Sequence, residues 1–370
     1  MKKFLSLLLV LVLAFSLVGC GKKEDKKPEQ PADGKTTEQK QEDQKDAQKK
    51  DAKDLHIGFV TDIGGIDDKS YNQTTWEGVK KFAADFGLED SQITFLQSKT
   101  EADYIPNLSS LADQKMDLIV AAGYKFQKAL TDIADNYPDQ KFLIIDSVVE
   151  KPNVASAIFS ENEGSFLVGV AAGLKTKAEG KNKVGFIGGE DSELIQRFEA
   201  GYVQGVKAVD PNIEVVIEYA ASFADPAKGQ TIASKLYDSG CYVIYHAAGG
   251  TGNGVIKEAK DRKLNGQDVW AIGVDTDQYD EGIYEGDKSV ILTSMLKGVG
   301  VASHDVCKMV MDGTFKGELL VFDLSNDGVD IPANNPNLEK EWVDEIQKFK
   351  EKVKSGEIKV DPVPERIKKN

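Results

Sequence analysis

Short apolar runs recur along the chain from residue 55 onward, at intervals of roughly 30 residues, with amphipathic helical patterns between them. The runs are continuous rather than alternating, which is typical of strands buried on both faces of a parallel sheet. Right-handed crossovers then connect one strand to the next. The sequence therefore predicts an α/β fold, with strands at residues 57–60, 93–96, 118–122, 142–145, 155–159, 184–187, 215–219, 242–245, 269–274 and 290–293.

Ten strands are too many for one compact Rossmann-like sheet, so we predict two lobes. The pattern restarts near residue 155 without a preceding helix, which indicates a first passage between lobes there. Residues 318–330 have the pattern of a terminal hairpin, and a polar amphipathic helix is expected at 337–355. The predicted lobes comprise residues 55–157 with about 294–318, and residues 158–293 with about 319–370.

The N-terminus has the order of a secretory signal, with Lys2 and Lys3 followed by an apolar run at residues 4–18. This run is shorter than the roughly 20 residues that span a bilayer. It ends in Leu-Val-Gly-Cys, which resembles a bacterial lipobox. We expect residues 1–20 to be a lipoprotein signal peptide, with Cys20 diacylated at the outer face of the cytoplasmic membrane. The alternative is an ordinary signal with a chance cysteine.

Residues 21–54 consist almost wholly of charged residues, Gln, Pro, Thr and Ala, and cannot bury enough apolar surface to fold. We expect a disordered, charged tether. Its Lys residues balance its Asp and Glu residues, and Lys2 and Lys3 give the signal a charge of +2, so the formal net charge of −15 of the whole chain leaves −17 on residues 55–370. An acidic domain of this kind is repelled by nucleic acid and by anionic lipid, so we expect neither as a direct partner of the folded part.

Ligands of doubly wound sheets bind at the carboxyl ends of the strands. The residues expected there include carboxylates, aromatic rings, an amide and a lysine. Aromatic faces can sandwich a planar ring, and an Asp accepts hydrogen bonds from the vicinal hydroxyls of a sugar. A planar ring with an attached sugar is a nucleoside. The candidate residues are Asp62, Tyr71, Asn72, Asp146, Phe223, Gly249, Asp275 and Lys297.

Most of the candidates also have a structural interpretation, and Tyr71 could be a hydrophobic staple. Asp62, Asp275 and Asn72 could cap helices. Phe223 precedes Asp225-Pro226 at a helix start and could be a hydrophobic staple. Lys297 taken alone would be a solvated charge. The argument for a site rests on their expected meeting at one sheet edge.

The glycine-rich run at residues 249–254 follows a strand and opens a helix, but its spacing departs from the dinucleotide fingerprint. We interpret it as a turn whose backbone approaches a ligand closely. The sequence has no nucleophile elbow, zinc motif or Walker loop, so we predict neither an enzyme nor a cofactor or metal. Cys241 and Cys307 are interpreted as core residues, and their pairing is left open.

The sequence Thr-Asp-Ile-Gly-Gly-Ile-Asp-Asp-Lys-Ser-Tyr-Asn-Gln at residues 61–73, placed after a lipobox and a charged tether, resembles the basic membrane protein (BMP) lipoprotein family. Further matches in the same order are Ile-Asp-Ser at 145–147, Phe-Glu-Ala-Gly-Tyr at 198–202, the glycine run at 246–254, Ile-Gly-Val-Asp at 272–275 and Ser-Met-Leu-Lys at 294–297. The family consists of PnrA-like substrate-binding proteins of ABC transporters.

The resemblance implies a type I periplasmic-binding-protein fold whose two lobes, joined by a hinge, enclose a purine nucleoside. By position, Tyr71 and Phe223 would sandwich the base. Base-side polar contacts would come from Asp62, Asn72 and Asp146, and ribose contacts from Gly249, Asp275 and Lys297. The family's usual residue at position 71 is Phe, so the Tyr71 hydroxyl needs a partner of its own.

We therefore predict a lipid-anchored, extracytoplasmic receptor that delivers a nucleoside to an ABC permease and its ATPase subunits. A receptor for a sugar or autoinducer-type ligand is the alternative within the same fold. A nucleoside-processing enzyme built on residues 249–254 and a surface sensor or adhesin without a transport role are alternatives from other classes.

Overall fold

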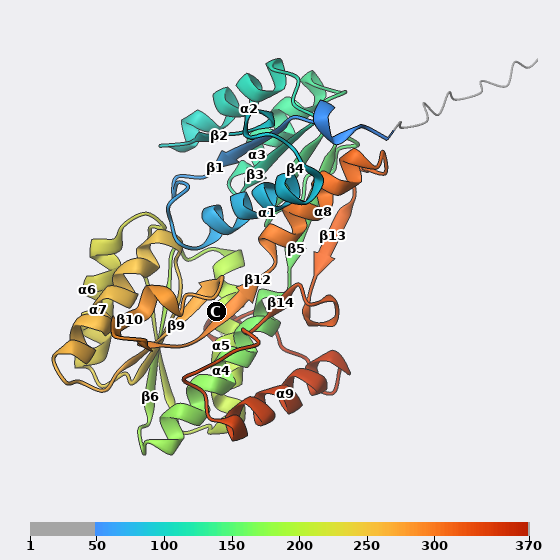
Figure 1. Cartoon of the computed structure of the whole chain (residues 1–370). Helices are drawn as coiled ribbons and strands as arrows, with labels where there is room; N and C mark the ends of the chain where they lie inside the picture. Colours follow the sequence, from blue (N-terminus) through green and yellow to red (C-terminus); the bar gives the residue numbers. More distant parts are fainter. Residues whose placement is uncertain (1–48, 369–370) are drawn as a thin grey trace, which may run out of the picture. The chain divides into compact units, whose positions relative to one another are not determined.

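The computed structural model describes residues 49–368, in which the chain forms two six-stranded sheets with helices packed on them (Figure 1). The predicted signal peptide with Cys20, and the predicted tether as far as residue 48, lie outside the described residues. The described chain is already packed before residue 55, where we expected the folded part to begin. The Lys50 N–H donates to the Met311 carbonyl at 2.8 Å, and Ala52–Asp54 form a 3-10 helix, η1.

The first sheet is entirely parallel, with the strand order β13-β5-β4-β3-β1-β2. Every residue of β1, β3 and β4 is buried, which accounts for their continuous apolar sequences. The edge strands β2 and β13 are partly exposed. The elements of this half are β1 (Ile57–Thr61), β2 (Ile93–Gln97), β3 (Leu118–Ala122), β4 (Phe142–Ile145), β5 (Val154–Phe159), β13 (Leu319–Phe322), α1 (Tyr71–Phe86), α2 (Tyr104–Asp113), α3 (Phe126–Ile133) and α8 (Val299–Met311), which packs against α1.

The second sheet has the order β14-β12-β9-β8-β6-β7 and is parallel except for β14, which runs antiparallel to β12. Helices α4 and α5 pack closely on each other, as do α6 and α7. The elements of this half are α4 (Glu161–Ala178), β6 (Lys183–Gly188), α5 (Glu193–Val209), β7 (Glu214–Tyr219), α6 (Pro226–Asp238), β8 (Val243–Ala247), α7 (Gly252–Leu264), β9 (Trp270–Asp275), β12 (Ile291–Lys297), β14 (Val329–Asp330), α9 (Lys340–Lys354) and α10 (Glu365–Lys368).

The remaining elements are short. Strands β10 (Ile283–Glu285) and β11 (Lys288–Ser289) form a two-stranded ribbon. Single 3-10 turns complete the connections, namely η2 (Asp90–Gln92), η3 (Glu101–Asp103), η4 (Ala134–Asn136), η5 (Gly249–Thr251), η6 (Asp280–Gly282) and η7 (Leu324–Asn326).

The chain passes from one sheet to the other after β5, after β12, and between β13 and β14. The expected lobe boundaries near residues 157, 293 and 318 lie inside β5, inside β12 and just before β13. The passages in the structure come after these strands end, at Ser160, at Gly298 and in the segment containing η7. Apolar composition is continuous along each strand, so it gives no sign of where the connection begins.

The prediction of a hairpin at residues 318–330 is wrong. β13 pairs in parallel with β5 of the first sheet, whereas β14 pairs antiparallel with β12 of the second. The Asn-Asp-Gly turn between them is a passage between sheets, in which Asp327 has a positive φ of 56°. Each short strand finds its partner in an existing sheet edge, and this long-range pairing overrides the local hairpin signal.

Cys241 and Cys307 are both buried and free, so they form no disulfide with each other. They belong to separate hydrophobic clusters. Their interpretation as core residues is confirmed.

Candidate ligand-binding site

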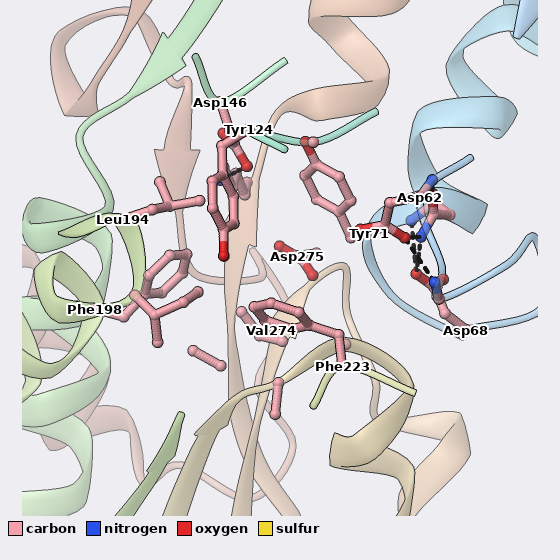
Figure 2. A pocket seen from close by; sticks show the side chains of 18 residues that line it. Asp62, Asp68, Tyr71, Tyr124, Asp146, Leu194, Phe198, Phe223, Val274 and Asp275 are labelled. Carbon is pink, nitrogen blue, oxygen red and sulfur yellow. Dashed lines mark hydrogen bonds and ion pairs between the residues drawn. The ribbon is translucent and has the colours of Figure 1, made fainter. Parts of the chain in front are cut away.

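A cavity lies where strand ends of the two sheets face each other, with about 550 Å³ of space between protein atoms, including the part open to solvent. All eight candidate residues from the sequence line it (Figure 2). Several other lining residues were not among the candidates. The additional lining residues are Gly64, Asp68, Gly123, Tyr124, Leu194, Ile195, Phe198, Ala247, Ala248 and Val274.

The loop between β1 and α1 is organised by Asp68 rather than by Asp62. The Asp68 carboxylate accepts hydrogen bonds from the backbone N–H groups of Ser70, Asn72 and Gln73 at 2.8–3.1 Å, and so caps the start of α1. It also accepts from the Asn72 side-chain amide at 3.0 Å. The capping interpretation offered for Asp62 therefore belongs to Asp68.

Asn72 is 1 % exposed, and its amide is occupied within this loop. Its Nδ2 donates to Asp62 Oδ1 at 2.8 Å and to Asp68 Oδ2, which uses both amide protons. Its Oδ1 accepts from the Asp62 N–H at 3.2 Å. Asn72 is therefore placed to orient Asp62 toward the cavity.

Asp62 Oδ1 accepts hydrogen bonds from Asn72 and from the Gly64 N–H at 2.8 Å, which leaves Oδ2 available to another donor. Burial raises the pKa of Asp62 to about 6, against the lowering effect of these hydrogen bonds. A hydrogen-bond donor on a ligand would stabilise the ionised form.

Four aromatic side chains line the cavity, and two of them are the predicted stacking residues, Tyr71 at the start of α1 and Phe223 after β7. Figure 2 shows Tyr71 on one side of Asp275 and Phe223 on the other. The Phe223 ring lies against the backbone of Gly189, where an added Cβ would be 2.2 Å from Cε1. The Tyr71 hydroxyl is buried beside Asp146, and it forms no hydrogen bond of ordinary geometry with a described residue.

Lys297, at the end of β12, is 2 % exposed and is not the solvated charge that the alternative interpretation required. Its Nζ lies 2.7 Å from each oxygen of Asp146 and 3.0 Å from Glu161 Oε1. Burial alone would lower the pKa of Lys297, but the carboxylates of Asp146, Glu161 and Asp275 raise it. Lys297 is therefore held in its charged form.

Lys297 also links the two halves of the site, because Asp146 follows β4 of the first sheet and Glu161 begins α4 beside the second. Its Nζ is 5.5 Å from the centre of the Tyr71 ring and 5.3 Å from that of Phe198, within cation–π range. Asp146 therefore lies with Lys297 rather than with Asp62, and Figure 2 shows these two aspartates apart.

Asp146 directly follows β4 and Asp275 is the last residue of β9, and both adopt positive φ, 68° and 67°. Such a backbone costs non-glycine residues on the order of 1–3 kcal/mol and is concentrated at functional sites. Asp275 Oδ2 accepts a short hydrogen bond from the Ser70 hydroxyl of the other half. Burial raises the pKa of Asp275 to about 7, although Lys297 opposes this.

Three consecutive residues of the β1–α1 loop, Asp68, Lys69 and Ser70, reach across to the second half, and we call this segment the clasp. The Asp68 carbonyl accepts from Asn253 Nδ2 at 3.0 Å, and the Lys69 carbonyl accepts from Gln278 Nε2 at 2.8 Å. Ser70 donates to Asp275. The clasp therefore ties the first half to α7 and to the segment after β9.

A second set of cross-links lies at Glu190, which follows β6. Its carboxylate accepts from the Tyr124 hydroxyl at 3.0 Å and from Lys125 Nζ at 2.8 Å. Both partners follow β3 of the first sheet. The two halves are thus joined on two sides of the cavity.

The glycine run at residues 249–254 is a turn followed by α7, in agreement with the simpler interpretation. Its glycines serve close packing: an added Cβ at Gly252 would lie 2.1 Å from the His246 ring, and one at Gly254 would lie 1.8 Å from the Pro226 carbonyl. Gly249 lines the cavity with a positive φ of 52°. Burial lowers the pKa of His246 to about 4, so this ring is neutral in the core.

Residues 49–368 contain no group of three or more His, Cys, Asp or Glu residues suited to hold a metal ion. Within the same range, none of the helices combines the length and the apolar character needed to cross a membrane.

Two lobes of largely parallel sheet with a cavity between their strand ends are the architecture of the solute-binding proteins of ABC transporters. Comparison with solved structures agrees. A solute-binding protein of an ABC transporter system from Aeropyrum pernix superposes with a TM-score of 0.74 at 27 % identity, covering 82 % of this chain and 92 % of that structure.

The family model described as "ABC transporter substrate-binding protein PnrA-like" matches residues 56–362. A Listeria monocytogenes protein named "CD4+ T-cell-stimulating antigen" is 43 % identical over 325 residues, 85 % of this chain and 90 % of the relative. A Lactococcus lactis protein named "ABC transporter nucleoside-binding protein BmpA" is 41 % identical over 317 residues, 83 % and 89 % of the two chains. The chain belongs to the Bmp family of PnrA-like ABC transporter substrate-binding proteins.

Family membership confirms the predicted resemblance, the fold class and the assignment to a binding protein rather than an enzyme. It implies two kinds of partner, a small ligand and an ABC permease.

Proposed function

We propose that the cavity captures a nucleoside, with a purine as the preferred base, for delivery to the permease. The observation that carries this proposal is the pairing of two aromatic rings, Tyr71 and Phe223, with buried acceptors in one cavity. A planar base suits the rings. The free oxygen of Asp62 would accept a hydrogen bond from a donor on the base edge.

The sugar would lie toward Asp275, Lys297 and Asp146. Carboxylate oxygens accept hydrogen bonds from vicinal hydroxyls, and the Lys297 ammonium donates to hydroxyl oxygens. The structure favours grouping Asp146 with these residues, because its carboxylate pairs with Lys297. The Lactococcus relative, named a nucleoside-binding protein, supports the same ligand class.

Calorimetry with purine nucleosides, pyrimidine nucleosides and ribose tests the ligand. We expect binding of nucleosides, tightest for purines, and no heat from ribose alone. Binding of ribose or another simple sugar without nucleoside binding would support the sugar-receptor alternative and contradict our proposal.

Substitution at position 71 tests the stacking role. Tyr71→Leu removes the ring and should weaken binding by about 1–3 kcal/mol, the usual contribution of base stacking on an aromatic side chain. The matched variant Tyr71→Phe keeps the ring, and should stay within about threefold of the original affinity. Equal losses in both variants would assign the effect to the hydroxyl.

We also propose that the mature protein is anchored to the extracytoplasmic face of the membrane through acylated Cys20. The support is the sequence Leu-Val-Gly-Cys after a short apolar run. Radiolabelled fatty acid should be incorporated in cells expressing the full chain, and Cys20→Ala should abolish labelling and release the protein from membranes. Labelling that persists in Cys20→Ala would refute this anchor.

A further inference from the structure

A second cavity adjoins the first and shares three lining residues with it, Tyr124, Asp146 and Leu194. It has about 920 Å³ of space between protein atoms, including its open part. The residues that line only this second cavity include Glu161 and Arg197. The ligand compartment therefore extends beyond the slot between Tyr71 and Phe223.

The second cavity is rich in buried hydrogen-bond acceptors. The Glu161 side chain is fully buried, and neither of its carboxylate oxygens has a hydrogen bond of ordinary geometry with a described residue. Asp146 Oδ1, whose side chain is 3 % exposed, also lacks such a hydrogen bond, although Lys297 Nζ lies 2.7 Å from it and 3.0 Å from Glu161 Oε1. Lys297 neutralises part of this charge, and Arg197 Nη1 approaches Glu161 only to 3.6 Å. Buried acceptors of this kind gain from a hydrogen-bond donor.

An anionic group on a ligand would be repelled by the carboxylates of the second cavity. Asp146, Glu161 and Glu193 all line the second cavity, and they outnumber the cations Arg197 and Lys297 that face them. Desolvating a phosphate beside these carboxylates costs free energy that the two cations, already paired, do not return.

The two cavities meet at the side of the site remote from Asp62. Figure 2 shows Tyr124, Asp146 and Leu194 grouped on one side, with Asp62 and Asp68 on the other. If the base lies with Tyr71, Phe223 and Asp62, the sugar is directed toward the shared wall. The exocyclic carbon of the sugar, C5′, is attached to C4′, across the ring oxygen from the carbon that carries the base, so a substituent on it extends beyond the sugar.

We infer that the second cavity is a subsite for a group attached at C5′ of the bound nucleoside, and that it takes an amino or other donor-bearing group in preference to an anionic one. The inference rests on the proposed nucleoside function. It adds a class of ligand, the 5′-substituted nucleosides with a neutral or cationic substituent.

Calorimetry on the wild-type protein compares adenosine, 5′-amino-5′-deoxyadenosine and adenosine 5′-monophosphate. We expect the amine to bind within about threefold of adenosine or more tightly, and the monophosphate to bind at least about tenfold more weakly. An amine that binds about tenfold more weakly than adenosine would overturn the inference while leaving the proposed function intact. Failure of every nucleoside to bind would instead remove the proposed function, and the inference with it.

A substitution by tryptophan distinguishes the contributions of the two cavities to binding. Glu193 lines the second cavity alone and is exposed at the start of α5, so Glu193→Trp should narrow that cavity without altering the first. We expect adenosine affinity to stay within about threefold and the amine to lose about tenfold. Equal effects on the two ligands, or none on either, would contradict a 5′ subsite.

Two controls accompany this variant. Glu193→Gln removes the charge without adding bulk, and Ala208→Trp places the same ring at an exposed position near the far end of α5. Glu161→Gln removes an acceptor charge from the wall, and should reduce the ratio of amine to adenosine affinity. An unchanged ratio would show that Glu161 does not face the substituent.

Discussion

Phe223 shows how a single neighbouring residue can set the position of a ring that lines the cavity. Its ring occupies the space where a side chain at position 189 would begin. Gly189 does not have a positive φ, so the backbone does not require glycine there. The close approach of the ring is therefore the reason that position 189 has no side chain.

Gly189→Ala should displace the Phe223 ring and weaken nucleoside binding by about tenfold, while the fold is retained. Calorimetry measures the affinity, and circular dichroism checks the fold. In a Phe223→Leu background the same substitution should have little further effect on affinity, because the free-energy effects of two substitutions that act through one contact do not add. Additive losses in the double variant would assign Gly189 a role independent of Phe223.

The sequence was a good guide to which residues meet, and a poorer guide to what each one does. Asp62, Tyr71 and Asp275 could be predicted because strand ends of parallel sheets converge. The sequence could not predict that both amide protons of Asn72 are used within the loop, because one of them is donated to Asp68. Asp68 is one of two adjacent aspartates, and it was not among the candidates. Nothing in the pattern says which of two adjacent carboxylates turns toward the helix start.

At the scale of elements, the β1–α1 loop joins the two halves of the site. Asp68 fixes its conformation through backbone N–H groups, and the clasp then presents two carbonyls and a hydroxyl to the second half. Lys69 adopts a positive φ of 59°, a conformation that costs a non-glycine residue free energy. Interactions of this kind stabilise a closed arrangement and so slow the departure of a ligand.

Asn253→Ala should remove one clasp hydrogen bond and raise the ligand dissociation rate by about threefold to tenfold, because such bonds contribute about 0.5–1.5 kcal/mol. Stopped-flow chase experiments measure this rate. The matched control is Asn265→Ala at the other end of α7, where the amide donates to the Asp261 carbonyl away from the cavity. A dissociation rate that rises equally in both variants would point to general loosening of α7 rather than to the clasp.

For the whole molecule, the number and apolar character of the strands predicted a two-lobe architecture, and the structure confirms it. Local patterns were less reliable where long-range pairing decides the outcome. Leu319–Phe322 and Val329–Asp330 have the sequence of a hairpin, but each completes the edge of a different sheet. No signal within residues 318–330 distinguishes these alternatives, because the competing partner strands lie far away in sequence.

The ligand-free molecule carries an electrostatic cost at neutral pH that a ligand should relieve. Burial raises the pKa values of Asp62 and Asp275 to about 6 and about 7, from an ordinary value of 3.8. Between about pH 4 and pH 7 the folded state therefore holds protons that the unfolded state has released. Its free energy of unfolding should fall as pH rises through this window and become level above it.

Asp275→Asn should reduce this dependence, and the comparison with the wild type cancels the contributions of the other titrating groups. We expect the variant to be more stable than the wild type at pH 8 by about 1–4 kcal/mol, with the difference shrinking toward pH 4. Urea unfolding at several pH values measures it. In calorimetry the same variant should bind nucleoside at least about tenfold more weakly at pH 8, because a neutral amide is a poorer acceptor than a carboxylate. A variant that is both less stable and equally tight in binding would show that Asp275 is a structural residue, since a ligand-facing carboxylate requires the opposite signs in the two measurements.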